Sequence, residues 1–138
     1  MVMIVIPGEP VAQGRPCFTR TGRAYDPTKS RNYKALVRQF TTQAVTEPPI
    51  SGPVRCEVKM FRSIQKAGST ALHVQKAQGF VRPVVKPDVD NVFKAVTDAM
   101  KGIVWLDDNQ IVEARIEKFY SDTPRVEVVV EAIKEDKT

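Results

Sequence analysis

Two stretches of the chain alternate between apolar and polar side chains, interrupted at Phe61 and Val129, and this pattern constrains the fold more than any other feature. Val54–Arg62 carries an apolar residue at every second position, and Arg125–Ile133 repeats the pattern. Such alternation is typical of a strand that is buried on one face only. The sequence therefore predicts a sheet that needs other elements to cover one of its faces.

Two segments with helical periodicity can supply this cover. Within Lys29–Val45, apolar residues recur at three- and four-residue spacing, which predicts an amphipathic helix. Asp26 or Thr28 is expected to cap its first turn, with Pro27 close to the start. A second helix is expected over Asp90–Lys101, where the same spacing recurs.

The second predicted helix has polar residues on one side and an apolar stripe on the other. Asp90 can cap its first turn, and Gly102 is expected to end it because glycine readily follows a helix C-terminus. The stripe that we expect to be buried consists of Val89, Phe93, Val96 and Met100.

Short strands account for most of the remaining chain. Met1–Ile6 is predicted to be a buried strand, and Thr21-Gly22 to form the turn of a small hairpin that starts at Cys17. Ile111–Tyr120 is predicted to be a strand that pairs with Arg125–Ile133 in an antiparallel hairpin.

The segment Ser63–Val85 is the least regular part of the sequence. Thr70–Gln78 has helical potential, but glycine and proline interrupt the segment, and a partly mobile basic loop is expected. The order of elements predicts the α/β (α+β) class, with two principal helices packed on a mixed, mainly antiparallel sheet.

Length and composition limit the class of protein. With 138 residues, of which 42% are hydrophobic, the chain suits a single domain over residues 1–138. There is no run of about 18 apolar residues, and the N-terminal segment lacks a basic region before its apolar residues. We therefore expect a cytoplasmic protein that has no membrane partner. Cys17 and Cys56 lack the spacing of metal ligands and are expected to remain thiols.

Basic and acidic residues are segregated along the chain. Residues 1–45 hold seven basic and two acidic residues and so account for the whole net charge of +5. Ser63–Pro87 is basic without any acid, whereas Asp88–Glu113 holds six acids and two lysines. Basic clusters attract polyanions. An acidic segment between basic ones fits a cation site within an anion-binding surface.

The acidic segment carries two groups of carboxylates. Asp88 and Asp90 flank the start of the second predicted helix, and Asp107-Asp108 follows its end. An extended segment over Val104–Leu106 could lead the chain back and bring the two groups of carboxylates together. In that case a bound cation would be needed to neutralise their mutual repulsion. Mg²⁺ suits such oxygen ligands. The spacing lacks the glycine and third ligand of an EF-hand, and a single histidine argues against zinc.

Each of these residues also has a simpler structural interpretation. Asp88 and Asp90 can serve as helix caps, and Asp107-Asp108 can be a solvated turn. Lys94 lies four residues after Asp90, so the two can form a surface ion pair. Taken together with the segregated charges, the residues favour a metal-dependent phosphoryl-transfer site.

Two groups of residues together match the signature of a known family. They are Lys86–Lys94 (KPDVDNVFK), Asp98 and Trp105–Ile111 (WLDDNQI), and, near the start, Ile6–Pro10 (IPGEP), Gln13–Pro16 (QGRP) and Tyr25. This pattern resembles the RusA family of small, homodimeric, magnesium-dependent Holliday junction resolvases, which are common in phages and prophages. The resemblance spans most of the chain and is weakest across Ser63–Val85.

The resemblance implies a role for each acidic residue of the pattern. Asp88, Asp90 and Asp108 would bind Mg²⁺, for which Mn²⁺ can substitute, and Asp107 would be an additional carboxylate. Lys94 would stabilise charge on the scissile phosphate. Paired symmetric cuts in a four-way junction would require two sites, hence a two-fold homodimer. Candidates for phosphate contacts are Arg15, Arg20, Arg23, Lys29, Arg31 and Lys86.

Three other functions remain open on the sequence. A DNA-binding protein without nuclease activity would use the carboxylates only as caps and turns. A hydrolase of small phosphate esters would need only a compact pocket, which the wide spread of basic residues disfavours. A nuclease that acts on flaps or other branched DNA would share all of the features above.

Overall fold

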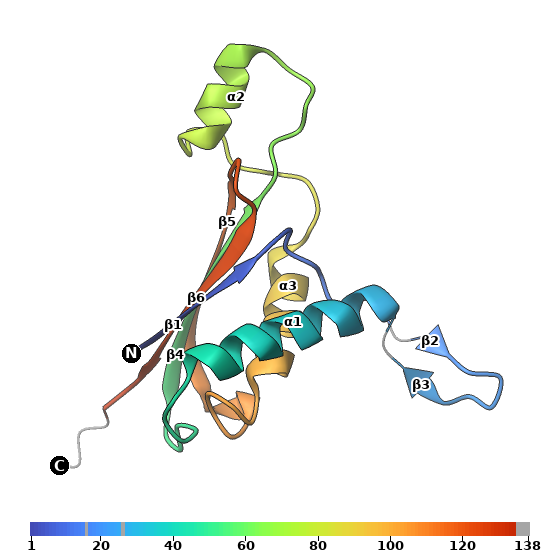
Figure 1. The fold of residues 1–138 in the computed structure, drawn as a ribbon, viewed down its shortest axis with the longest axis vertical. Helices are drawn as coiled ribbons and strands as arrows, with labels where there is room; N and C mark the ends of the chain where they lie inside the picture. Colours follow the sequence, from blue (N-terminus) through green and yellow to red (C-terminus); the bar gives the residue numbers. More distant parts are fainter. Residues whose placement is uncertain (16, 26, 135–138) are drawn as a thin grey trace.

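The computed structural model describes residues 1–15, 17–25 and 27–134, and it shows a four-stranded sheet with two helices on one face (Figure 1). This confirms the predicted class of two principal helices packed on a mixed, mainly antiparallel sheet. The sheet contains β1 (Val2–Pro7), β4 (Val54–Arg62), β5 (Ile111–Tyr120) and β6 (Arg125–Ala132), and the two helices are α1 (Thr28–Ala44) and α3 (Val89–Met100). The smaller elements are β2 (Cys17–Phe18), β3 (Ala24–Tyr25), α2 (Thr70–Ala77) and the 3₁₀ turn η1 (Asp108–Gln110).

The strands lie in the order β1-β6-β4-β5. β6 is antiparallel to both β1 and β4, whereas β5 runs parallel to β4, with Val58 opposite Ile116. The prediction that β5 and β6 form an antiparallel hairpin is therefore wrong. The physical reason is polarity: β6 buries Val126, Val128 and Val130 and suits the interior of the sheet, whereas the more polar β5 suits an edge.

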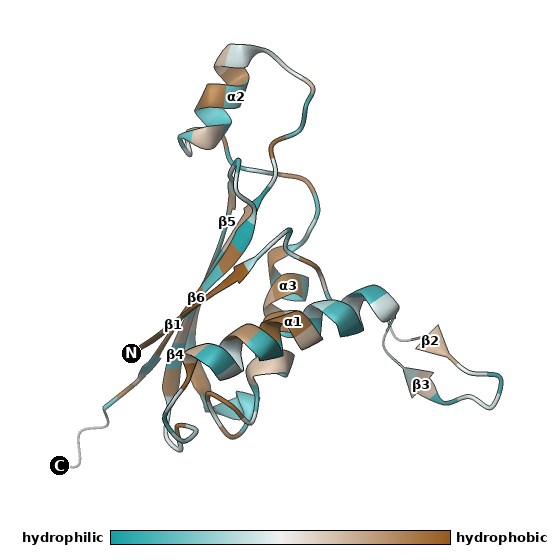
Figure 2. Cartoon of the chain, in the orientation of Figure 1, coloured by the Kyte–Doolittle hydropathy of each residue, from teal (hydrophilic) through white to brown (hydrophobic). Residues whose placement is uncertain are grey.

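The core lies between the sheet and the two helices. Alternate residues of the strands point into it, as the sequence predicts, and Figure 2 shows the apolar sides of α1 and α3 turned toward the sheet. Trp105 is fully buried at the end of α3. The fully buried strand residues are Ile6, Val54, Cys56, Val58, Met60, Val126, Val128 and Val130. No helix in the described ranges is both long enough and apolar enough to cross a membrane.

The start of α1 differs from the prediction. Pro27 occupies the N-cap position and no side chain caps the helix, so Thr28 is the first helical residue and not the cap. Asp26, the other predicted cap, lies outside the described residues. Proline needs no hydrogen-bond acceptor for its nitrogen and has a backbone angle that suits this position.

The buried side of α3 is broader than the predicted stripe. Val96 and Met100 are buried as expected, but Val89 and Phe93 are only half-buried. The residues that complete the buried side are Val92, Ala95, Thr97 and Ala99. This shift arises because α3 packs against α1 as well as against the sheet, so two neighbours cover it. Gly102, with φ +84°, follows the helix as predicted.

The segment between β4 and α3 contains the short helix α2, which stands beyond the end of the sheet (Figure 1). Ser69 caps it by accepting a hydrogen bond from the Leu72 amide at 3.1 Å, and none of its residues is buried. His73 contacts Asp122 of the β5–β6 connection at 3.1 Å. The expectation of a loop throughout Ser63–Val85 is therefore wrong over Thr70–Ala77, where the helical potential is realised because Ser69 caps the helix.

The two cysteines provide a test of the core. Both are free thiols, as expected. Cys17 is half-exposed, whereas Cys56 is buried. Burial raises the pKa of the Cys56 thiol to about 12. Only the thiolate reacts with alkylating reagents. At pH 8 we expect iodoacetamide to label Cys17 and to leave Cys56 unmodified until urea unfolds the protein. Mass spectrometry of the digest measures this, and labelling of Cys56 in the folded protein would contradict the packing.

Candidate active site

The start of α3 presents two carboxylates whose side chains have no hydrogen-bond or ion-pair partner among the described residues. Asp88 is the N-cap residue and Asp90 lies in the first turn, but neither caps the helix through its side chain, so the prediction that Asp90 is a cap is wrong. Both are exposed, and neither makes a side-chain hydrogen bond or ion pair within the described ranges. Their oxygens are therefore available to a ligand.

The second acidic pair follows α3 through a tight turn. The Gly102 amide donates to the Trp105 carbonyl at 2.7 Å, so the chain reverses here and does not return in the extended conformation that we expected. Gln110 then fixes the acidic turn: its side-chain oxygen accepts from the Leu106 and Asp107 amides at 2.8 Å each. Its amide group donates to the carbonyls of Ile50 and Gly52.

The two residues of this pair point to different places. Asp107 lies beside Lys101 at the C-terminal end of α3, with 3.7 Å between the charged atoms. Asp108 is half-buried, and its Oδ1 accepts a hydrogen bond from the indole nitrogen of Trp105 at 2.8 Å. Asp108 also acts electrostatically on Lys94, in the middle of α3. Asp108 is therefore the member of the pair whose charge acts on Lys94.

Lys94 is held as a cation among acids. Its ammonium group donates to Asp98 at 2.7 Å, and Asp98 also lies 3.4 Å from Lys34 of α1. The predicted surface pair with Asp90 is thus replaced by a pair with Asp98. The hydrogen bond to Asp98, aided by the charges of Asp98 and Asp108, raises the pKa of Lys94 despite partial desolvation. Lys94 therefore stays protonated at neutral pH, one turn beyond Asp90.

The carboxylate oxygens of this site suit a magnesium ion, although the described residues do not form a complete set of metal ligands. Among residues 1–15, 17–25 and 27–134, no group of three His, Cys, Asp or Glu side chains is placed to hold a metal ion. Mg²⁺ commonly takes one or two carboxylates together with waters and substrate phosphates. The unpaired carboxylates of Asp88 and Asp90 match that chemistry, and the second oxygen of Asp108 has no hydrogen-bond partner among the described residues.

Two cationic side chains of the sheet hold the segment that leads into Asp88. Arg62, at the end of β4, donates to the Lys86 carbonyl at 2.7 Å. Lys118 of β5 donates to the carbonyls of Val85 and Pro87 at 2.7 and 3.0 Å. Three consecutive carbonyls are thus fixed by charged donors, which are stronger than neutral ones. These contacts set the position of Asp88 relative to the sheet.

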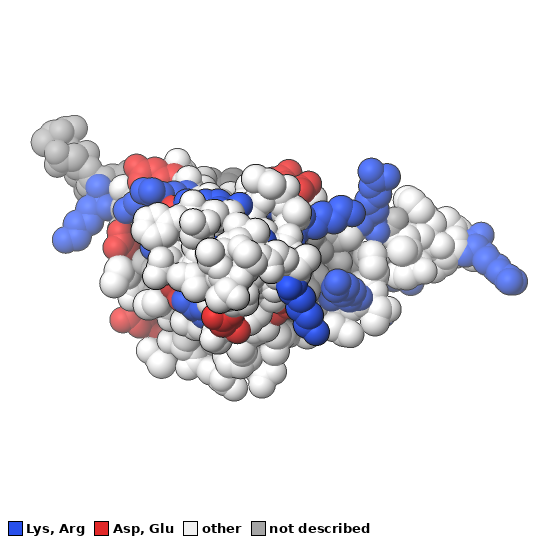
Figure 3. Space-filling view, turned by 90° about the horizontal axis from the view of Figure 1, so that it is seen from above, with Lys and Arg blue, Asp and Glu red and all other residues white. Residues whose placement is uncertain are grey.

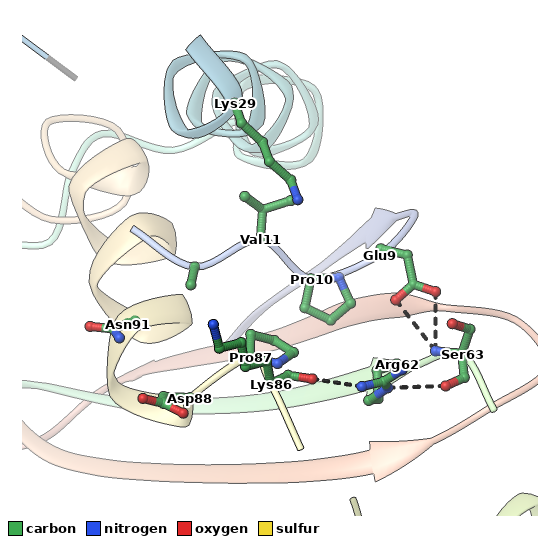
Figure 4. A pocket seen from close by; sticks show the side chains of 11 residues that line it. Glu9, Pro10, Val11, Lys29, Arg62, Ser63, Lys86, Pro87, Asp88 and Asn91 are labelled. Atoms are coloured by element: carbon green, nitrogen blue, oxygen red, sulfur yellow. Dashed lines mark hydrogen bonds between the residues drawn. The ribbon is translucent and has the colours of Figure 1, made fainter. Parts of the chain in front are cut away.

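A cavity of about 570 Å³ opens beside Asp88. Figure 4 shows Asp88 and Asn91 on one side of it, Lys29 above and Arg62 with Ser63 at the other end. Glu9 accepts from the Ser63 amide at 3.1 and 3.3 Å and so helps to close that end. The full lining is Glu9, Pro10, Val11, Ala12, Lys29, Arg62, Ser63, Lys86, Pro87, Asp88 and Asn91. Three cations and a free carboxylate therefore face one space.

The six predicted phosphate contacts fall into three groups. Lys29 and Lys86 line the cavity, as just described. Arg20 and Arg23 lie on the exposed β2–β3 hairpin, which stands away from the sheet in Figure 1. Figure 3 shows Lys and Arg side chains over the body and at the tip of this projection. The remaining two, Arg15 and Arg31, are exposed, and Arg31 donates to Thr28 at 3.3 Å.

Sequence reasoning missed Arg62, Lys118, Asn91 and Gln110. Arg62 gave a weak signal, since it ends a strand directly before the basic segment. Lys118 gave none, because its role depends on β5 lying parallel to β4, which the sequence pattern did not indicate. Gln110 was part of the quoted signature, but its contacts with Ile50 and Gly52 depend on the tertiary fold.

Comparisons with known proteins find similar sequences over most of the chain. The model of a family described as "Endodeoxyribonuclease RusA" matches residues 7–131. An "Uncharacterized protein YqaN" of Bacillus subtilis (strain 168) is 41% identical over 137 residues, and the match covers 96% of each chain. The matched range includes both acidic pairs, Lys94 and every residue that lines the cavity.

The contacts of Lys118 can be tested without any assay of activity. Replacement Lys118→Met removes the donors to Val85 and Pro87, and we expect the free energy of unfolding to fall by roughly 1–3 kcal/mol. Hydrogen exchange should become faster around Val85–Asp88 and stay unchanged in α1. Urea unfolding and exchange monitored by mass spectrometry measure both effects.

The matched control is Lys59→Met on β4. Lys59 makes only a surface ion pair with Glu57 at 4.0 Å, and its loss should cost no more than about 1 kcal/mol. Equal effects of the two substitutions on stability and on exchange would contradict the role given to Lys118.

Proposed function

The chain belongs to the RusA endodeoxyribonuclease family, and from that premise we propose that it is a Mg²⁺-dependent nuclease that resolves four-way DNA junctions. The cuts would be paired and symmetric, in DNA recombination and repair. The observation that carries the proposal is the pair of unpartnered carboxylates at the start of α3, Asp88 and Asp90, of which Asp88 lines a cavity together with three cations.

Hydrolysis of a phosphodiester needs an activated water and positive charge near the phosphate oxygens. We assign Asp88, Asp90 and Asp108 as the ligands of Mg²⁺ or of Mn²⁺ in its place, with Asp107 as an additional acid. The bound metal would lower the pKa of a water and bind a phosphate oxygen. Since the described residues hold no ready-made cage, the phosphate backbone of DNA would supply further oxygen ligands.

The surrounding side chains would position the DNA. The cavity is lined by three positively charged side chains, which would attract the phosphate backbone. They are Lys29, Arg62 and Lys86. Lys94, kept protonated by Asp98, would add a fixed positive charge one turn from Asp90. Its raised pKa makes it an electrostatic group and not a general base at neutral pH.

A polymeric substrate accounts for the distribution of basic residues. Arg20 and Arg23 on the hairpin lie outside the cavity, where a small phosphate ester would not reach them. Symmetric cuts in the two strands of a junction require two sites related by a two-fold axis, and we therefore propose a homodimer. Action on flaps or other branched DNA is the main competing function within the same chemistry.

Cleavage assays test the proposal directly. Purified protein should cut a labelled four-way junction only when Mg²⁺ is present, and should leave a linear duplex of matching sequence intact. Replacement Asp90→Asn removes a proposed ligand and should lower the cleavage rate by at least about 100-fold, a loss of roughly 3 kcal/mol of transition-state stabilisation. Denaturing gels of end-labelled strands measure both the rate and the symmetry of the cuts.

The control for charge is Glu47→Gln, in the exposed loop before β4, where Glu47 makes no described contact. This variant should cleave at the rate of the unmodified protein. Full activity of Asp90→Asn would exclude the role given to Asp90. Faster cleavage of flaps than of four-way junctions would favour the competing function.

Trp105 offers a measurement of metal binding that does not depend on activity. It is the single tryptophan of the chain, and its indole nitrogen donates to Asp108. Binding of Mg²⁺ by Asp108 would withdraw electron density from that hydrogen bond. We expect a saturable change in tryptophan emission on titration with MgCl₂, and no such change in Asp108→Asn. A titration with NaCl at equal ionic strength controls for screening, and identical curves for the two salts would contradict binding at Asp108.

A further inference from the structure

The β2–β3 hairpin carries an aromatic side chain that the fold does not use. Phe18 is 69% exposed, and its partner across the hairpin is Ala24, which is too small to cover the ring. Tyr25, whose partner is Cys17, is 46% exposed. Because neighbouring residues of a strand point to opposite faces, the hairpin offers an aromatic ring on each face.

Resting on the function proposed above, we infer that this hairpin recognises the branch point of DNA and that Phe18 stacks on a base exposed there. A four-way junction interrupts the continuous stack of base pairs, so the faces of bases at its centre are open to an aromatic ring. A linear duplex offers no such face except at its ends. Stacking of this kind tolerates any base sequence.

The structure of the hairpin suits a rigid arm. The Thr19 amide donates to the Arg23 carbonyl at 2.9 Å, and the Arg23 amide donates to the Thr19 hydroxyl at 3.1 Å. The Gly22 amide donates to the Thr19 carbonyl at 2.9 Å, and Gly22 has φ +82°, which favours glycine. These bonds hold the tip in one conformation, so an arm that contacts DNA loses little conformational entropy on binding.

The chain that leads into the hairpin is tied to the candidate active site. The Gln13 amide donates to the carbonyl of Asn91, the residue after Asp90, at 2.9 Å. The Gly14 amide donates to the Ser30 hydroxyl at 2.8 Å, and a side chain at Gly14 would come within 2.8 Å of Pro27. The approach to the hairpin is therefore fixed against the start of both α1 and α3, next to the carboxylates.

Charge identifies DNA as the occupant of this surface. The sequence from residue 10 to residue 25 holds Arg15, Arg20 and Arg23 and no acid. All three arginines are exposed, and no acidic side chain is visible on the hairpin in Figure 3. A surface for a second copy of this chain would need acids opposite the arginines to avoid repulsion. Arginines that flank an exposed ring fit a polyanion whose bases can stack.

The test compares binding to branched and linear DNA without cleavage. All variants carry Asp90→Asn and are studied without Mg²⁺, so the result does not depend on nuclease activity. The probes are a four-way junction and a linear duplex of matching sequence, each with 2-aminopurine at the position of the branch. Fluorescence reports stacking on that base, and anisotropy of a terminal dye gives the Kd.

Replacement Phe18→Ala is expected to weaken binding to the junction about tenfold, within the range measured for stacked bases. Binding to the duplex should change less than about twofold, because phosphate contacts dominate there. The change in 2-aminopurine emission on binding should disappear in Phe18→Ala and return in Phe18→Trp. Replacement of Arg20 and Arg23 by Gln should weaken both complexes and lower the salt slope by about 0.9 for each phosphate that is no longer neutralised.

The matched control is Phe80→Ala, because Phe80 is 78% exposed in the segment after α2, away from the hairpin. It should bind both probes as the parent does. Equal weakening of junction and duplex by Phe18→Ala, or no weakening, would overturn the inference. Light scattering should show the same oligomeric state for Phe18→Ala as for the parent. If Phe18→Ala instead dissociates, and the Kd of the remaining dimers for the junction is unchanged, Phe18 would belong to an interface between two copies and the inference would be overturned. The cleavage assays above address the nuclease activity separately.

Discussion

The packing of α3 against both α1 and the sheet is the constraint on which the candidate site depends. Val92, Val96 and Met100 are fully buried, and burial of such side chains stabilises a fold by about 1.5–3 kcal/mol each. This packing fixes the rotation of the helix about its own axis. The opposite side of α3, with Asp90, Lys94 and Asp98, is then presented outward, and the cationic contacts of Arg62 and Lys118 fix the chain just before it.

The charged side chains along α3 fall into two sets: Lys94 and Asp98 form an ion pair, whereas Asp88 and Asp90 are unpaired among the described residues. Asp98 and Lys94 neutralise each other, and their hydrogen bond holds the lysine in place. Asp88 and Asp90 have no such partner among the described residues, although the protein has a net charge of +5 and cations line the adjacent cavity. At the start of α3 these carboxylates gain only a modest stabilisation from the helix dipole. Their availability is useful only if an additional cation or a ligand binds there, as the nuclease proposal requires.

Local patterns in the sequence predicted the elements well, but not all of their pairings. Alternation identified β4 and β6, and periodicity identified α1 and α3, because each pattern reflects which face is buried. The position of β6 between β1 and β4 was missed, since the pattern of a strand does not name its neighbours. The candidate site residues were selected from their types and spacing and from the family resemblance, and their roles stay predictions. The contacts of Asp108 with Trp105 and of Lys118 with Val85 and Pro87 required the tertiary fold.

The arrangement of cations also bears on how a nuclease of this size could select branched DNA. Phosphate contacts such as those offered by Lys29 and Lys86 exist in every duplex, so they provide affinity without discrimination. Selection requires a contact that only the branched form can make, and the contact must be rigidly placed relative to the carboxylates. The bonds of Gln13 to Asn91 and of Gly14 to Ser30 bear on the second condition, because they fix the chain that leads to the β2–β3 hairpin against the starts of α3 and α1. The proposed stacking of Phe18 would meet the first, because its ring is exposed and a continuous duplex offers no open base face except at its ends.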